Sequence, residues 1–485
     1  MHPEAGSEDF AAQRSPTAWP KQAVHGLMVL VPLALVFLAV YAYVCVAADR
    51  DLQGVIVEAD RLDPGWQWDD LEAKRAVIPD AENGALRVLE AERLLPTHPW
   101  PPPLADSPDG MVLSLPPAAQ LDETQTKELH ASLQKAAPAL TAARALIGLP
   151  RGRYPMSWPL DALSTNYTCQ HAREVATLLQ LEADLLAQKH DADGALSLGR
   201  AIVNAGRSIG DEPAIISQLV RMSCQSSAMA SMERTLAQGQ PTEQPLAAAQ
   251  RTVEEEASEP LLLIGLRGER AAQHRMLEAI ETGELKFSQM SRAGGPGKTN
   301  GGWYNDFGGK VLMRRNHAPL LRLHTKGVEI AKLPVEEQST AVHQVFVEQR
   351  GMPILVGLAL PSLQRPAAAF HRQQARLRCT ATALAAERYR RSKGRWPGSL
   401  SELVATRFIR AVPMDPYDGA PLRFRATPTG LVIYCTGPDR EDNGGKLNRM
   451  NPEAEGYDMG FELWNVKQRR QPAMRTSDAL NEITP

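Results

Sequence analysis

An uncharged stretch near the N-terminus places the strongest constraint on how this chain can fold. Residues 26–48 contain no Asp, Glu, Lys or Arg. A helix of that length spans about 34 Å, and the hydrocarbon core of a bilayer is roughly 30 Å thick. Tyr41 and Tyr43 lie near one end, where interfacial aromatic residues are common. The stretch therefore predicts a transmembrane helix.

A cleaved signal peptide is the competing interpretation of this stretch. Such a signal has an apolar core of roughly 7 to 15 residues after a short basic start. Here the core is longer, and a polar segment of mixed charge precedes it. We therefore expect an uncleaved anchor at residues 24–48 after a cytoplasmic tail at residues 1–23. Arg14 and Lys21 precede the anchor, which favours a single-pass protein of the cell membrane with the bulk of the chain outside the cytoplasm.

The composition favours helices and argues against nucleic acid and nucleotide partners. The formal net charge is −3 and the pI is near 6.4, whereas a nucleic-acid-binding domain needs a strongly basic face. Ala and Leu are abundant while aromatic residues make up 5% of the chain, which favours helix over sheet. The glycine-rich run at residues 294–299 lacks the spacing of a phosphate-binding loop, and no strand precedes it.

The segment after the anchor has two parts. Residues 49–121 read as a juxtamembrane segment followed by a Pro-rich linker, and Trp66 and Trp68 are expected to pack on the next domain. An α-helical domain then covers residues 122–350 and includes a glycine-rich loop at residues 294–309. The four cysteines beyond the anchor are far apart, so we expect small buried side chains rather than a disulfide framework.

Apolar residues at helical spacing divide the α-helical domain into successive helices. The segments end at turn residues, and they cover residues 171–190, 195–203, 214–238, 245–258 and 260–281. Helices of this length joined by short loops must stack as antiparallel hairpins to bury their apolar faces. The stretch from Glu182 to Leu196 resembles the turn of a tetratricopeptide unit, and the likeness extends over residues 171–210. We therefore expect a solenoid-like domain of helical hairpins.

The C-terminal quarter predicts a small α+β unit at residues 351–466. A long helix is expected from near Pro366 to Arg391, because apolar residues form a stripe along it. Ser399 and Glu402 have the spacing of a helix cap. Alternating and β-branched residues predict strands of an antiparallel sheet near residues 421–425, 431–435 and 460–464. Residues 467–485 are expected to form a disordered tail.

The order of parts in this quarter carries a resemblance to a known family. The helix ends in a Tyr-Arg pair and is followed by Gly394-Arg-Trp-Pro397, Asp415-Pro-Tyr-Asp-Gly419 and an acidic, glycine-rich loop. In this order the segment resembles the major pseudopilins of type II secretion systems. The resemblance implies an assembly subunit rather than an enzyme. It fails upstream, because Val356 stands where pilins keep a glutamate and the apolar run is too short to span a membrane. The chain is therefore not expected to enter a pseudopilus as an ordinary subunit.

The resemblance also implies a calcium site in the acidic loop. The matching residues are Asp439, Asp442, Asn443 and Asp458, and calcium prefers six to eight oxygen ligands of this kind. The loop departs from the family at Arg440, where the family tends to have glycine. A solvated loop between two strands is the alternative interpretation.

The sequence thus favours a mainly α protein with one transmembrane helix, a helical-hairpin domain and a small α+β pseudopilin-like domain. The function expected for it is a non-catalytic scaffold that binds a protein partner in the cell envelope, tied to a type II secretion-like assembly. The alternative is a membrane-anchored hydrolase with an acid–base site around Glu269 and His274. Those two residues also fit a solvated helix face with local ion pairs.

Overall fold

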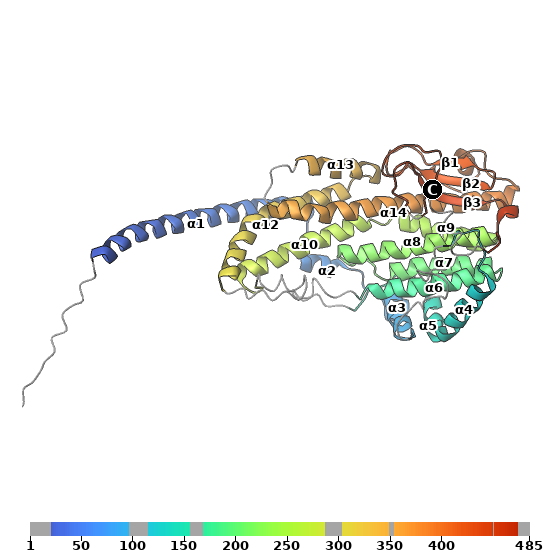
Figure 1. Ribbon diagram of the computed structural model, residues 1–485, viewed down its shortest axis with the longest axis horizontal. Coiled ribbons are helices and arrows are strands. Elements are labelled where there is room, and N and C mark those ends of the chain that lie inside the picture. Colours follow the sequence, from blue (N-terminus) through green and yellow to red (C-terminus); the bar gives the residue numbers. More distant parts are fainter. Residues whose placement is uncertain are drawn as a thin grey trace, which may run out of the picture.

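The structure is a computed structural model that describes residues 21–96, 115–155, 168–286, 303–348, 354–449 and 451–473 of the 485-residue chain. Most of the predicted cytoplasmic tail, residues 1–20, and most of the Pro-rich linker lie outside these residues. The protein is mainly helical, with one small antiparallel sheet. Figure 1 shows an elongated body of helices with the sheet at one end and helix α1 projecting from the other.

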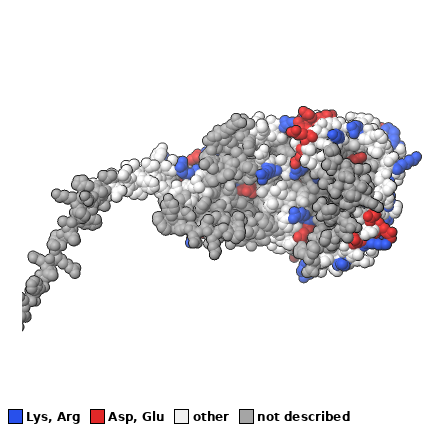
Figure 2. All heavy atoms as spheres, viewed as in Figure 1, with Lys and Arg blue, Asp and Glu red and all other residues white. Residues whose placement is uncertain are grey.

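Helix α1, at Lys21–Leu62, runs without interruption from the apolar stretch into the body. Among the described residues, Leu30–Leu62 is the stretch long and apolar enough to cross a membrane, with a hydropathy of 2.5. Its large apolar side chains are exposed up to Val46, and its last turns pack on α12 (Trp303–Ala331). Figure 2 shows the projecting part of α1 without charged side chains until it reaches the body, where both signs are interspersed.

Short helices follow α1 and support the larger ones. They are α2 (Trp68–Lys74), α3 (Gly84–Arg93), α4 (Glu123–Lys135) and α5 (Ala137–Arg144), with 3-10 turns at Asp80–Glu82 and Ala145–Gly148. Trp66 and Trp68 are both buried, as predicted. Trp66 packs against Val55 and Ala59 of α1 and contacts the apolar face of α12. This cluster attaches the end of α1 to the body.

The five predicted central helices are confirmed, four of them within two residues at each end, whereas the second begins three residues earlier and ends four residues later than predicted. They are α6 (Gln170–Gln188), α7 (Ala192–Arg207), α8 (Ile215–Gln238), α9 (Glu243–Ala257) and α10 (Leu261–Thr282). The Asp191 side chain caps α7 by accepting a hydrogen bond from the Gly194 N–H at 2.8 Å, and Gly283 ends α10 at a φ of 90°. Helices α6, α7 and α8 all contact one another, and α9 packs on α7.

Helix α14, at Ile354–Lys393, is 40 residues long and begins twelve residues before the predicted start near Pro366. The helix continues through Pro361 and Pro366 because this part is packed: Leu363, Ala367 and Phe370 are buried among residues of α10 and α12. Further along, α14 contacts the sheet as well as α8 and α9. One apolar core consequently extends from Ala85 in α3 to Leu463 in the sheet.

The sheet has the strand order β1-β2-β3, with β1 at Arg423–Ala426, β2 at Gly430–Cys435 and β3 at Met459–Trp464. Both pairings are antiparallel, and Ile433 of β2 lies opposite Phe424 and Phe461. All six residues of the central strand β2 are buried. The predicted antiparallel sheet is confirmed. Helix α15 (Leu400–Ala405) precedes the sheet, and Ser399 caps it as predicted.

Two predicted irregular segments are shorter than expected. The glycine-rich loop was predicted to extend to residue 309, but α12 begins at Trp303 and α13 (Val335–Glu348) follows it. The free-energy cost of about 1 kcal/mol for each glycine in a helix is small beside the long helical run that follows. The predicted disordered tail also starts too early, because residues 467–473 are ordered.

Two arginines order the start of that tail. Buried Arg469 donates hydrogen bonds to both carboxylate oxygens of Glu387 at 3.0 Å. Arg470 donates to the carbonyl oxygens of Ala187 and Gln188 at the end of α6. Both guanidiniums therefore attach the start of the tail to the helical body. Residues 474–485 lie outside the described part of the chain.

Candidate functional site

The acidic loop between β2 and β3 brings the predicted calcium ligands into one network. Asp458 stands just before β3 and is 1% exposed. Its Oδ1 accepts a hydrogen bond from the N–H of Asn443 at 3.2 Å, and its Oδ2 accepts one from the N–H of Gly445 at 2.6 Å. Gly445 has a φ of 75°, a conformation that glycine adopts without strain. Asp458 therefore closes the loop back onto the start of the last strand.

The other two carboxylates among the predicted ligands also accept backbone hydrogen bonds. Asp439 accepts one from the N–H of Gly456 at 3.1 Å, and Asp442 accepts one from the N–H of Gly444 at 2.9 Å. Asp442 also lies 3.2 Å from the Arg423 guanidinium of β1. Burial raises the pKa of Asp458, and the nearby charges of Asp442 and Asp439 raise it further. The loop thus concentrates negative charge that a cation could neutralise.

This loop has the ligand types of a calcium site, but its ligand atoms do not lie close enough together to form one. Hard carboxylate and amide oxygens fit the donor set that calcium prefers. Within the described residues, however, the group of three or more potential ligands whose atoms lie within 4.8 Å of one another is Glu92, His171 and Glu174. Calcium binding by Asp439, Asp442, Asn443 and Asp458 therefore stays a prediction.

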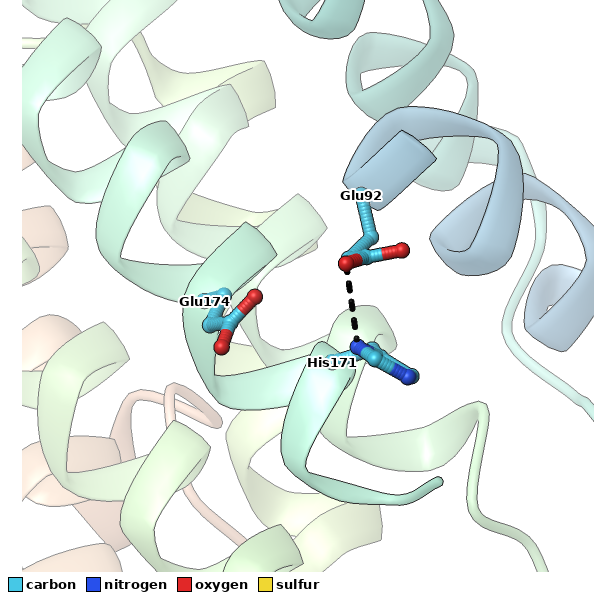
Figure 3. A group of neighbouring side chains, drawn as sticks. All are labelled: Glu92, His171 and Glu174. Atoms are coloured by element: carbon cyan, nitrogen blue, oxygen red, sulfur yellow. Dashed lines mark ion pairs between the residues drawn. The ribbon is translucent and has the colours of Figure 1, made fainter. Parts of the chain in front are cut away.

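Glu92, His171 and Glu174 form a half-exposed group between α3 and α6 (Figure 3). His171 Nδ1 lies 3.5 Å from Glu92 Oε1, without a hydrogen bond. His171 and Glu174 are three residues apart on α6, which places both on one face. One imidazole and two carboxylates are a donor set that zinc and manganese accept. The spacing of the pair on α6 was visible in the sequence, but its partner on α3 was not.

The acid–base pair considered in the sequence does not form as expected. Burial raises the pKa of Glu269, but no hydrogen bond or ion pair joins it to His274 in the described residues. Arg267 and Arg270, which lie on the same helix, do not pair with Glu269 either. Both donate hydrogen bonds to the carboxylate of Asp63 at 2.5 Å. The expected cluster on one face of α10 is therefore divided between two sets of partners.

His274 belongs instead to a three-residue chain. Its Nδ1 lies 2.8 Å from Nε2 of His317, and Nδ1 of His317 lies 2.8 Å from Oε1 of Glu281. Burial and the neighbouring His317 ring lower the pKa of His274 to about 4, so the ring is neutral at pH 7. His274 and Glu281 are seven residues apart on α10, a spacing that puts them on one face. The contribution of His317 from α12 could not be read from that spacing.

A cleft lies where the helical body meets the acidic loop. It encloses about 190 Å³ and is lined by α6, α8, α14 and the segment leading into β3. Its charged lining residues are Asp184, Glu233, Arg234, Arg376, Arg449 and Asp458. Burial raises the pKa of Asp184 to about 6, and the Arg234 guanidinium opposes that rise only in part. Titratable groups with shifted pKa values in a cleft are typical of binding and catalytic sites.

Known proteins give no family assignment with which to interpret these groups. No protein-family model, no curated protein and no solved structure matches this chain.

Proposed function

We propose that this chain is a single-pass protein of the cell envelope that acts as a non-catalytic scaffold and binds a protein partner. The observation that carries the proposal is the continuity of α1, which leads from a membrane-length apolar stretch directly into the body. A scaffold that positions a partner at a membrane needs such a fixed connection. With the N-terminus of α1 in the cytoplasm, the body lies outside it.

Ion pairs along α1 support a rigid connection. Arg314 of α12 donates a hydrogen bond to Asp49 at 2.8 Å, and Arg322 donates one to Asp51 at 2.7 Å. At the other end, Asp63 follows α1 directly and accepts hydrogen bonds from Arg267 and Arg270 of α10. Exposed pairs contribute little individually, but the buried Asp63 site orients the helix end against α10.

The proposal further links this chain to a type II secretion-like assembly. A long helix, a capped short helix, a three-stranded antiparallel sheet and an acidic loop follow one another here. That order is the one in which the sequence resembles the major pseudopilins. Strand β1 is an edge of the sheet, and edge strands offer backbone groups to a partner. We propose that a pilin-like subunit contacts this end of the body.

Site-specific cross-linking in membranes tests the partner proposal. A photo-reactive residue replaces exposed Arg425 on β1 or, as the matched control, exposed Lys127 on α4. We expect a defined cross-linked band from position 425 and none from position 127, with a pilin-like subunit identified by mass spectrometry. Equal labelling at both positions, or a band that contains no envelope protein, would contradict the proposal.

Calcium in the acidic loop is a further part of the proposal, and chelation tests it. A bound ion stabilises the folded state by mass action, because the unfolded loop has no preformed site. We expect EGTA to lower the melting temperature of the purified chain, and added calcium to restore it. The variant Asp458→Asn should lose this response, whereas Asp418→Asn, outside the loop, should keep it. An unchanged melting curve would refute calcium binding and leave the fold assignment intact.

A membrane-anchored hydrolase remains the second candidate because of the Glu281–His317–His274 chain. A carboxylate that orients a histidine is one part of an acid–base site. The remaining part is a nucleophile at the free end of the chain, and no described residue donates a hydrogen bond to His274 from a hydroxyl or thiol group. The scaffold function is therefore the better supported of the two.

A further inference from the structure

Among the described residues of the cleft between the helical body and the acidic loop, one cation has no hydrogen-bond or ion-pair partner. Arg376 of α14 lines the cleft and is half-buried. No described residue accepts a hydrogen bond from its guanidinium or lies within ion-pair distance of it. Burial lowers the pKa of Arg376, and the Glu233 charge opposes that effect only in part. A guanidinium in this setting is incompletely compensated.

The other two cations of the cleft donate hydrogen bonds to protein acceptors, although Nε of Arg234 has no hydrogen-bond partner. Arg234 donates to the carbonyl oxygens of Pro116 and Ala119, at 3.3 and 3.1 Å. Arg449 donates two hydrogen bonds to Glu233, at 2.6 and 3.0 Å, and a third to Glu462 at 3.0 Å. These guanidiniums hold the walls of the cleft together. Among the described residues that line the cleft, Arg376 is the cation whose guanidinium makes no hydrogen bond or ion pair.

The anions of the cleft compensate the charge of Arg376 only in part. Glu233 is paired with Arg449 and also accepts the N–H of Glu462 at 2.9 Å. The Asp458 carboxylate accepts its two backbone hydrogen bonds within the acidic loop. Asp184 is 2% exposed, and its nearest cation is Arg234 at 3.7 Å. The cleft therefore has a free cationic group and a wall of carboxylates.

From this arrangement we propose that the cleft binds a monocarboxylate through paired hydrogen bonds from Arg376. A planar guanidinium matches a carboxylate with two parallel N–H···O bonds. A dianionic phosphate fits less well, because Asp184, Glu233 and Asp458 line the same space and repel a second negative charge. A volume of about 190 Å³ admits a short acid or the end of a peptide. This binding function is separate from the scaffold function and depends on neither the anchor nor the edge strand.

Isothermal titration calorimetry of the full chain in detergent tests the proposal by measuring its affinity for four probes. The probes are propionate, alanyl-alanine, alanyl-alanine amide and inorganic phosphate. We expect the wild type to bind at least one of the two carboxylates and to bind the amide and phosphate at least about tenfold more weakly, since a charge-assisted pair is lost or repelled. Tighter binding of alanyl-alanine than of propionate identifies a peptide end as the ligand, and similar affinities identify a free acid. Either result supports the proposal.

Two substitutions on α14 provide the matched comparison. Arg376→Gln should weaken carboxylate binding roughly tenfold to a hundredfold. Arg372→Gln removes the same charge one turn earlier, where Arg372 pairs with Glu453 at 2.6 Å, and should leave binding unchanged. If Arg376→Gln does not fold, Arg376→Lys keeps the charge without the planar fork and should still bind more weakly. The proposal is overturned if the wild type binds neither carboxylate, if phosphate or the amide binds equally well, or if both α14 variants behave alike.

Discussion

Glu256→Ala is expected to destabilise the body by about 3–5 kcal/mol, the range typical of breaking a buried charge network from one side. Glu256 is fully buried, with its side chain 0% exposed. Its oxygens accept hydrogen bonds from Arg207 and Arg221 at 2.7 Å each and from Gln225 at 2.6 Å. Removing the carboxylate takes away the buried anion that Arg207 and Arg221 share, and leaves them only the more exposed Glu255 and Glu259 at 3.2 and 3.7 Å. The urea midpoint followed by circular dichroism measures the loss.

A surface pair provides the control for that experiment. Glu123 and Lys127 form an i,i+4 pair on α4 with side chains 83% and 74% exposed. Glu123→Ala should change the free energy of unfolding by no more than about 0.5 kcal/mol. A Glu256→Ala midpoint as close to the wild type as that of the control would contradict the network interpretation.

The pH dependence gives an independent measurement on the same residue. Burial alone would raise the pKa of Glu256, but the Arg221 and Arg207 guanidiniums outweigh it and hold the pKa at about 2. A carboxylate whose pKa is lowered on folding contributes stability above its unfolded pKa of about 4.3, and loses it as the pH falls toward 2. The stability difference between wild type and Glu256→Gln should therefore narrow across that interval. A constant difference would mean that the charge of Glu256 is not responsible.

The second large effect is expected on membrane retention, because α1 is the proposed anchor. The wild-type chain should stay in the membrane fraction after alkaline carbonate extraction. The apolar part of α1 exposes side chains such as Leu33, Leu35 and Phe37, each more than half exposed, which water disfavours and a bilayer accepts. Deletion of residues 1–48 should release the body into the soluble fraction. N-terminal sequencing of the extracted wild type should give the start of the chain. A mature N-terminus near Ala48 would identify a signal sequence and refute the anchor.

A charge placed on α1 separates insertion from simple adhesion. Val36→Arg puts a guanidinium in the middle of the apolar stretch, where insertion scales assign a penalty of roughly 2.5–3.5 kcal/mol. Val57→Arg is the matched control, since Val57 is 66% exposed on the part of α1 that lies along the body. We expect the first variant to reduce membrane retention and the second to leave it unchanged. Equal retention of both would argue that the body, rather than α1, attaches to the membrane.

The elements most accurately predicted from sequence are those whose signals are local. Helix α10, predicted at residues 260–281, is Leu261–Thr282, and it ends at Gly283, whose backbone conformation suits glycine. The strands of the sheet alternate or carry β-branched residues such as Val432 and Ile433, and β2 appears within one residue of its predicted bounds. Caps, turns and periodicity act within a few residues, so a single sequence contains them.

The candidate sites could not be predicted as well from the sequence, because their residues come from distant segments of the chain. The cleft joins Asp184, Arg376 and Asp458 from two helices and the start of a strand. No spacing rule connects residues on α6 with residues on α14. The start of α14 was missed for a related reason, since packing of Phe370 outweighs the local signal of Pro366. Local patterns specify elements, whereas sites depend on which elements meet.

The placement of α14 between the sheet and the central helices has a consequence for how the protein is made. Helices α8 and α9 are complete by Ala257, but the helix that covers them ends only at Lys393. At a synthesis rate of about 5–20 residues per second, their apolar surface waits several seconds for its cover. During that interval the nascent chain exposes residues such as Val253 and Ala249, which are fully buried in the finished fold. The order of the elements along the chain therefore leaves this surface open to aggregation until α14 has been synthesised.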